Sequence, residues 1–349
     1  MKIGIFDHLD TRDIDLSQFY EDRLALVSIY DQLGFHAYHV AEHHFTPLGL
    51  SPSPSVYLSA IAQKTKRILF GPLVYTLPLY HPLRLSDEIC MLDQMSKGRL
   101  QLGIGRGVSP FEVGYFGVDN DHAQSIYLES FEVLMQSLTQ STVSYMGKYF
   151  KYHNVPIVLK PFQKPHPPLW YGVGHPQGVD WCIANNVNAV VNGPLERVRQ
   201  ITDRFRQRWS ETGKDHLAMP LIGTSRHVVI SESEREAEVM AKSAYEKWYS
   251  SFMHLFTMHN SKPQFNAFPA SYEEARNEGL IIAGQPNTVC DFLKHEIHKS
   301  GVNYLLTRFA FGNLSLEHAI QSTQLFARHV MPSLQTLHPQ PKVNHEIFS

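Results

Sequence analysis

Residues Leu92 to Gly107, which read LDQMSKGRLQLGIGRG, carry more information about the fold than any other part of the sequence. The stretch predicts a helix end, a stop at Gly98, a short buried strand, and then the glycine-flanked Arg106 at the carboxyl end of that strand. In α/β proteins this is where ligands bind. The flanking glycines let a flat or anionic ligand approach the backbone, and a guanidinium suits phosphate. Because such a loop can also carry Gly and Arg simply to turn and stay soluble, this stretch alone leaves ligand binding open.

The alternation of short apolar runs and longer amphipathic runs continues along the whole chain. Eight strands, each followed by a helix, predict an α/β fold, a (β/α)₈ TIM barrel with insertions, rather than two domains. The expected strands are Lys2–Phe6, Ala37–Ala41, Ile68–Tyr75, Leu100–Ile104, Leu169–Val173, Ala189–Asn192, Ile222–Ile230 and Tyr304–Thr307. The expected helices are Leu16–Leu33, Ser53–Thr65, Pro82–Met95, Ala123–Leu138, Gln177–Asn185, Leu195–Thr212, Ser233–Ser251 and Leu316–Met331.

Two stretches do not fit this minimal repeat. We expect a single barrel domain over residues 1–335, with excursions at 143–168 and 254–284, and a peripheral tail at 336–349. The first excursion contains a predicted β-hairpin around 145–150. The second is long for a connector, which is typical of a lid or a disordered segment.

The composition limits the class of protein. The chain has 349 residues, 43% of them hydrophobic, and a formal net charge of −2. It can therefore bury a large core, and its scattered basic residues argue against nucleic-acid binding. No run approaches the ~18 apolar residues of a membrane helix. The apolar run after Met1 is interrupted by charge at Asp7, which is too early for the apolar stretch of a secretory leader. Three widely spaced cysteines fit a reducing compartment, so we expect a cytoplasmic protein.

An acid and two imidazoles follow the second expected strand, as Glu42-His43-His44. Imidazole titrates near neutral pH, so His43 or His44 could act as a general base or acid, with Glu42 holding the tautomer. The histidines could instead be packed in the loop or make a structural hydrogen bond. A metal site would need a third ligand, which adjacent positions do not supply, so no metal is expected.

Two further strand ends could contact a ligand. The apolar residues around Leu73 and Val74 could support the face of an aromatic cofactor, although barrel core is the simpler interpretation. The fifth strand runs into Gly174-His175-Pro176-Gln177-Gly178 and then a helix. Backbone amides at a helix N-terminus bind anions, but Gly and Pro also simply make turns.

Taken together, these stretches resemble the bacterial luciferase-like monooxygenases, which are flavin-dependent (β/α)₈ barrels. The similarity to the luciferase α subunit extends from Met1 to about Leu334, nearly the whole chain. It is carried by Glu42–Phe45, His81–Arg84, Leu92–Gly107, Gly301–Tyr304 and Met331-Pro332.

The resemblance implies roles for individual residues. His43 matches the histidine that assists flavin–oxygen chemistry and is the expected catalytic residue. Leu73 and Val74 match a pair joined by a non-prolyl cis peptide beneath the flavin rings. Arg106 matches the arginine that contacts the flavin phosphate, and residues 254–284 fall where the luciferase α subunit has its mobile lid. The loop expected to hold the rest of the phosphate contains Gly174, His175 and Gly178.

Two departures from the luciferase α subunit affect the expected activity. Gly105 stands where the luciferases carry a reactive cysteine beside the flavin, and Gly174-His175 stands where they carry an acidic residue followed by serine. These departures argue against long-lived light emission. They favour the wider family of FMN-dependent monooxygenases.

The resemblance implies an FMN-dependent monooxygenase that uses reduced flavin and O₂ to oxidise a small organic substrate such as an aldehyde. A separate flavin reductase could supply the reduced flavin. One alternative is a low-turnover flavin-binding protein of subunit type, against which the retained His43 argues. Another is an F420-dependent oxidoreductase on the same barrel, against which the features around Arg106 argue. Family members usually pair through early helices, so Ser53–Thr65 and Pro82–Met95 are the expected faces of a homodimer, although their apolar sides could equally be core.

Overall fold

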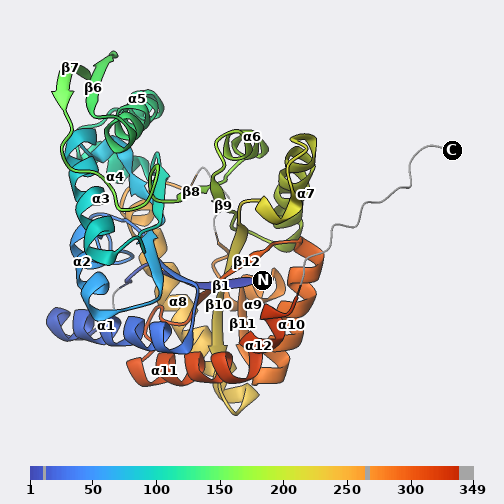
Figure 1. Ribbon diagram of the computed structural model, residues 1–349. Coiled ribbons are helices and arrows are strands. Elements are labelled where there is room, and N and C mark those ends of the chain that lie inside the picture. Colours follow the sequence, from blue (N-terminus) through green and yellow to red (C-terminus); the bar gives the residue numbers. More distant parts are fainter. Residues whose placement is uncertain (11–12, 264–267, 338–349) are drawn as a thin grey trace.

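The computed structural model describes residues 1–10, 13–263 and 268–337. Its parallel strands form a nearly closed barrel with helices on the outside (Figure 1). The barrel strands are β1 (Lys2–Asp7), β2 (Ala37–Val40), β3 (Leu69–Pro72), β4 (Tyr75–Thr76), β5 (Leu102–Gly105), β8 (Leu169–Gly172), β9 (Asn188–Val190), β10 (Ile222–Ile230), β11 (Ile281–Gly284) and β12 (Tyr304–Arg308).

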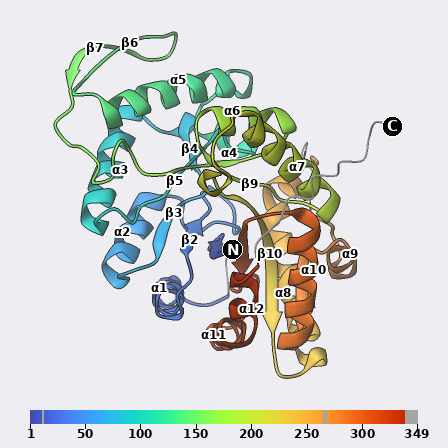
Figure 2. The same cartoon turned by 45° about the vertical axis from the view of Figure 1, so that its right-hand side comes forward.

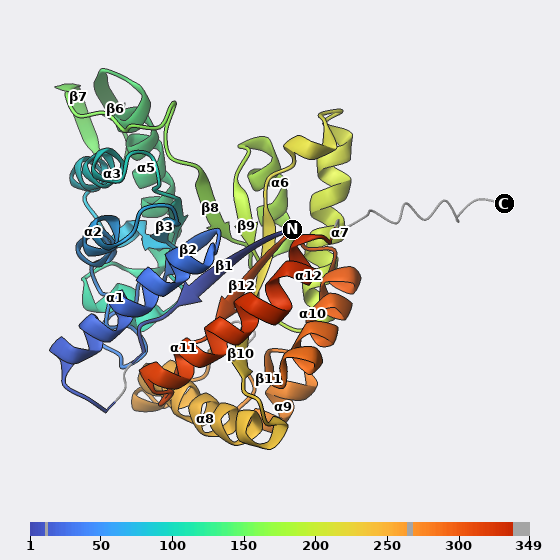
Figure 3. The same ribbon diagram turned by 60° about the horizontal axis from the view of Figure 1, so that its bottom comes forward.

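The helices surround these strands. They are α1 (Leu16–Leu33), α2 (Pro54–Lys64), α3 (Pro82–Ser96), α4 (Pro110–Tyr115), α5 (Asn120–Thr139), α6 (Pro176–Ala184), α7 (Leu195–Glu211), α8 (Glu234–Met258), α9 (Tyr272–Asn277), α10 (Pro286–Ser300), α11 (Leu316–Leu325) and α12 (Met331–Gln335). Helix α11 packs beside α1, so the last part of the described chain closes against the first (Figure 3). No helix in residues 1–10, 13–263 and 268–337 is long and apolar enough to cross a membrane.

The strand order confirms the predicted barrel. The sheet runs β3-β2-β1-β12-β10-β9-β8-β5-β4, and β11 pairs with β10 beyond it. Strands β3 and β4 are two parts of the strand expected at Ile68–Tyr75. A bridge between Phe70 and Leu100 brings β3 back beside the start of β5, which nearly closes the ring.

The stretch from Leu92 to Gly107 folds as its sequence predicts. Helix α3 ends at Ser96, and the stop follows because Lys97 and Gly98 both adopt positive φ angles, of 56° and 82°. The short strand β5 then leads into Gly107, whose φ of 89° favours glycine. Close approach requires glycine at Gly103 as well, because a Cβ there would lie 2.1 Å from the carbonyl oxygen of Pro72.

The first expected excursion contains the predicted hairpin. Strands β6 (Thr142–Met146) and β7 (Lys151–Pro156) pair antiparallel and form a separate two-stranded sheet. The hairpin stands beside α5, away from the barrel strands (Figure 2).

The second expected excursion differs most from the prediction. Residues 254–258 end α8, and residues 272–277 form α9. Residues Ile281–Gly284 form the barrel strand β11, and the unpredicted helix α10 follows. This strand was missed because its apolar run is only four residues long and follows a polar helix. Residues 264–267 lie outside the described part of the chain.

The C-terminal boundary also differs from the prediction. The helix expected at Leu316–Met331 ends at Leu325, and a π-helical turn, Phe326–Val330, leads into α12. Pro332 explains the break, because it has no amide to donate to the preceding turn. Of the expected tail, residues 338–349 lie outside the described part of the chain. The Met1 amino group donates to the carbonyl oxygens of Gln335 and Leu337, at 3.0 and 3.2 Å.

Candidate active site

A layer of polar side chains lies at the carboxyl end of the barrel. On β12, Tyr304 and Leu306 belong to an apolar cluster with Phe6 and Ala41 inside the barrel. Alternate residues of a strand share a face, so Arg308 lies one layer further towards the carboxyl end. Three histidines lie in the same layer. His8 follows Phe6 by two residues, His43 follows Ala41 by two residues, and His227 on β10 pairs with Arg308. The rings of His8 and His43 are 5.7 Å apart, and Arg308 lies 3.5 Å from Nε2 of His227.

His43 is paired with a carboxylate from a distant part of the chain. Its Nδ1 lies 3.1 Å from Oε1 of Glu112 on α4. The other Glu112 oxygen accepts the backbone N–H of His44 at 2.8 Å. Since Glu112 holds Nδ1, the tautomer with a free Nε2 is favoured, and no hydrogen-bond partner for Nε2 lies among the described residues.

The pair shifts the titration of both groups. Burial lowers the pKa of His43, but the charge and hydrogen bond of Glu112 outweigh it, and the net shift is upwards from 6.5. Burial raises the pKa of Glu112, but the charge and hydrogen bond of His43 and the His44 amide outweigh it, so this pKa lies below 4.5. The pair therefore favours the protonated form of His43 and the ionised form of Glu112.

Glu42 pairs with the neighbouring imidazole, that of His44. Its Oε1 lies 2.9 Å from Nε2 of His44, while its Oε2 accepts from the Thr76 amide and from the Tyr80 hydroxyl at 3.1 and 2.9 Å. The sequence prediction that Glu42 orients a histidine therefore holds for His44, whereas Glu112 orients His43. Among the described residues, no group of three His, Cys, Asp or Glu side chains could hold a metal ion.

A small cavity lies beside His43 and Glu112. It has a volume of about 20 Å³, which is room for about one water molecule. Phe252, Leu255 and Phe256 of α8 line its far wall. Helix α8 therefore covers the histidine from outside the barrel.

The floor between β3 and β5 is tightly packed. The peptide bond between Leu73 and Val74 is cis, as the resemblance implies. A Cβ at Gly105 would lie 2.4 Å from Cγ2 of Val74. A larger residue than glycine at position 105 would therefore require the Val74 side chain to shift.

Arg106 is exposed and has no hydrogen-bond or ion-pair partner in the part of the chain that the structure describes. Strands β5 and β8 pair in parallel with Ile104 opposite Tyr171, so Arg106 and the loop after Gly172 leave the barrel side by side. An exposed guanidinium and an uncapped helix N-terminus are groups of the kind that bind phosphate. A Cβ at Gly174 would meet nothing within 4 Å, and no side chain caps the N-terminus of α6 after His175. Gly178 lies in the first turn of α6, where its amide bonds back to the His175 carbonyl.

Sequence reasoning missed three residues of this site. Glu112 follows Ser109-Pro110, a helix-start signal, and Ser109 Oγ accepts the Glu112 amide at 3.3 Å. Its position just after the Gly-Arg-Gly loop was the available clue. His8 stands two residues beyond the expected end of the first strand and Arg308 one residue beyond that of the last, so polar residues just after each strand end were the available clue.

The chain is similar to known monooxygenases along most of its length. The family model for luciferase-like monooxygenases matches residues 1–304. An uncharacterised protein of Sinorhizobium fredii is 39% identical over 95% of this chain and 96% of its own. The oxygenase component of a flavin-dependent trigonelline monooxygenase from Acinetobacter baylyi is 28% identical over 80% of this chain and 75% of its own.

Solved structures share the fold. The monooxygenase RslO1 from Streptomyces bottropensis has a TM-score of 0.86 at 23% identity, covering 96% of this chain and 100% of its own. The oxygenating constituent of 3,6-diketocamphane monooxygenase from Pseudomonas putida, solved in complex with FMN, has a TM-score of 0.80 at 19% identity, covering 95% and 98%. The F420-dependent tetrahydromethanopterin reductase from Methanopyrus kandleri has a TM-score of 0.70 at 20% identity, covering 95% and 98%. On the strength of the family match, this chain belongs to the luciferase-like monooxygenase family.

Proposed function

We propose that this chain is the oxygenase component of an FMN-dependent monooxygenase. It takes reduced FMN from a separate flavin reductase and uses O₂ to oxidise a small organic substrate such as an aldehyde. The observation that carries the proposal is the pairing of His43 with Glu112, which leaves Nε2 free at the carboxyl end of the barrel.

Different residues bind the cofactor and manage the proton. Reduced flavin, when bound, supplies the electrons that activate O₂. Leu73 and Val74 support its ring system, and Arg106 with the loop from Gly174 to Gly178 holds its phosphate through a guanidinium and helix N-terminal amides. His43 donates and accepts a proton at Nε2, while Glu112 fixes its ring. The apolar side chains of α8 beside the His43 cavity keep water out.

The test is an anaerobic titration of the full chain with reduced FMN, followed by addition of O₂ with and without a panel of aldehydes. We expect saturable binding, and oxidised product replacing part of the hydrogen peroxide when an accepted aldehyde is present. Peroxide alone with every substrate would favour the low-turnover flavin-binding alternative. Binding of F420 but not of FMN would favour the deazaflavin alternative and overturn the proposal.

We also propose that the chain forms a homodimer in a reducing, cytoplasmic environment. Helices α2 and α3 pack against each other and expose apolar side chains: Val56 is 70% exposed, Met91 53% and Met95 46%. Burial of these side chains in a partner would stabilise the pair. Light scattering should give twice the monomer mass, and Met91→Glu should reduce it to that of the monomer.

A further inference from the structure

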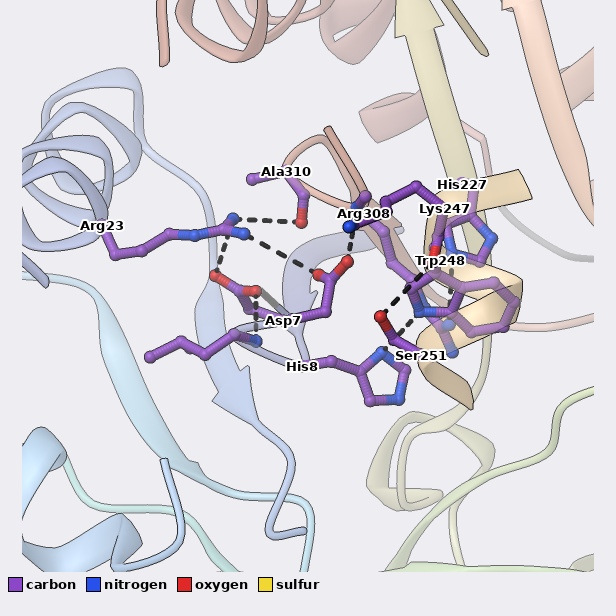
Figure 4. A network of polar contacts seen from close by, with 12 residues as sticks. Asp7, His8, Arg23, His227, Lys247, Trp248, Ser251, Arg308 and Ala310 are labelled. Atoms are coloured by element: carbon purple, nitrogen blue, oxygen red, sulfur yellow. Dashed lines mark hydrogen bonds and ion pairs between the residues drawn. The ribbon is translucent and has the colours of Figure 1, made fainter. Parts of the chain in front are cut away.

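Arg308 differs from the other buried arginines of the described chain. Arg23 lies 3.4 Å from Asp7 and 3.8 Å from Asp10, and Arg226 donates to Glu296 at 2.6 Å. Arg308 is only 3% exposed, yet no carboxylate of the described residues lies within 4.0 Å of it. Figure 4 shows the contrast, with Arg23 held by acidic groups while Arg308 lies beside His227 and Trp248. Burying a cation without a counter-charge is costly.

The guanidinium of Arg308 is only partly satisfied. Its Nη2 donates to Ser225 Oγ at 2.8 Å, and its Nη1 lies 3.5 Å from Nε2 of His227. Its Nε has no hydrogen-bond partner although it is buried. One edge of the fork is therefore left for a ligand.

Apolar rings surround the same group. The guanidinium carbon lies 4.7 Å from the ring centre of Phe6, 5.6 Å from that of Phe268 and 5.8 Å from that of Trp248. These walls suit the organic body of a small molecule rather than a hydrated ion. Low polarity around a cation also strengthens its attraction for an anion.

Asp10 and Asp7 raise the pKa of Arg308 from a distance, but neither forms an ion pair with it among the described residues. Burial, followed by the charge of Arg308, lowers the pKa of both His8 and His227 well below 6.5, so both rings are neutral. Burial and the charge of Arg226 lower the pKa of Arg308 to about 9, so it remains charged at neutral pH. The nearby Asp10 is held elsewhere, by Arg23 and by the Gly312 amide.

We infer that Arg308 binds the carboxylate of a small organic-acid substrate inside the barrel mouth. The inference rests on the proposed function and deepens it by naming the substrate class. A planar carboxylate can take two parallel hydrogen bonds from the fork of an arginine. His8 lies between this anchor and the catalytic side of the mouth, since its ring is 5.7 Å from His43 and its Nδ1 accepts from Trp248 Nε1 at 3.4 Å.

The position of Arg308 separates this site from the flavin phosphate. Arg308 ends β12, whereas Arg106 follows β5, and three strands lie between them in the sheet order. Arg106 is exposed at the rim, whereas Arg308 is buried one layer above the apolar cluster of the barrel interior. One arginine is placed for a cofactor that reaches out of the barrel, the other for a molecule enclosed in it.

The test is a calorimetric titration of the full chain, with and without FMN, using benzoate and its neutral analogue benzamide as probes. Benzoate should bind saturably and benzamide at least on the order of 10-fold more weakly. Arg308→Met should reduce benzoate affinity on the order of 10- to 100-fold without changing that for benzamide. Arg308→Lys keeps the charge but loses the planar guanidinium, so its benzoate affinity should lie between those of the wild type and Arg308→Met. It also provides the test if Arg308→Met does not fold. The matched control is Arg199→Met, which removes an exposed arginine of α7 and should leave benzoate affinity unchanged.

Four results would overturn the inference: no saturable benzoate binding, equal affinity for benzoate and benzamide, unchanged benzoate affinity in both Arg308 variants, or a loss of FMN affinity in Arg308→Met as large as the loss for benzoate. The last would assign Arg308 to the flavin. Failure of the wild-type chain to bind FMN would instead count against the proposed function, while benzoate binding to the FMN-free chain would still report on Arg308.

Discussion

The two sides of the barrel mouth bury charged groups in opposite ways. On the side of β2 and α4, each imidazole has its own carboxylate: Glu112 for His43 and Glu42 for His44. On the side of β10 and β12, Arg308 is buried beside the neutral rings of His8 and His227 with no carboxylate of the described chain within 4.0 Å. A histidine that is paired with a carboxylate can hold and release a proton. An arginine that is buried without a carboxylate can instead bind the negative charge of a ligand. The difference divides the mouth into a proton-handling side and an anion-binding side.

The largest effect should come from removing the proton-handling group. We expect His43→Ala to reduce turnover on the order of 10²- to 10⁴-fold while FMN affinity stays within a few-fold. The measurement is product formation with reduced FMN and O₂, beside a binding titration. His44→Gln is the matched control and should reduce turnover far less. Unchanged product formation in His43→Ala would remove this residue from the mechanism.

The next effect tests whether the exposed arginine belongs to the cofactor. Arg106→Ala should weaken FMN binding on the order of 10- to 100-fold, because a charge-assisted hydrogen bond to phosphate is lost. Riboflavin, which lacks the phosphate, should bind to the variant and the wild type nearly equally. Fluorescence titration with both ligands gives the comparison. Equal losses for both would place Arg106 away from the phosphate.

The pairing of His43 with Glu112 should appear in the pH dependence. Burial lowers the pKa of His43 and the Glu112 charge more than reverses this, so Glu112→Gln should lower that pKa and shift the corresponding limb of the pH–rate profile to lower pH. Glu42→Gln should shift it less, since Glu42 is the weakest contributor. NMR titration of the imidazole measures the shift directly. A larger shift in Glu42→Gln would mean that the two pairs are wrongly assigned.

The same pair makes a prediction for stability. The pKa of Glu112 is lowered on folding. Its contribution to the free energy of unfolding is therefore present above about pH 4.5 and is lost as the pH falls through the folded pKa. The pKa of His43 is raised, so its contribution is present below 6.5 and is lost as the pH rises through the folded pKa. The stability difference between the wild type and Glu112→Gln should therefore be largest between about pH 4.5 and pH 6.5. Urea unfolding across this range measures it, and a difference independent of pH would contradict the ion pair.

The smallest effect concerns packing beneath the proton-handling side. Gly105→Ala should lower the free energy of unfolding by about 1–3 kcal/mol, because its Cβ would lie 2.4 Å from Val74 Cγ2. Gly174→Ala is the control, since its Cβ would meet nothing within 4 Å and should change stability little. Denaturant unfolding separates the two variants. Equal stabilities would show that Val74 moves aside at no cost.

Most of the fold could be predicted from the sequence because barrel elements are local. The helix end at Ser96, the stop at Gly98 and the strand before Arg106 depend on residues within a few positions of one another. The strand Ile281–Gly284 could not be predicted, because four apolar residues are stabilised by pairing with β10 rather than by their own pattern. The candidate site divides in the same way. His43 and Arg106 could be recognised at strand ends, but the pairing of His43 with Glu112 could not.

By itself, the sequence determined that strands and helices alternate, that polar groups follow several strand ends, and that glycine stands at positions 98, 105 and 107. These are properties of neighbouring residues, set by hydrophobic period and backbone sterics. Only the tertiary structure decided that His43 pairs with Glu112, 69 residues away, and that Arg308 is buried without a carboxylate. The physical reason is that Coulomb attraction and burial depend on distances across the closed barrel, which no local pattern in the chain encodes.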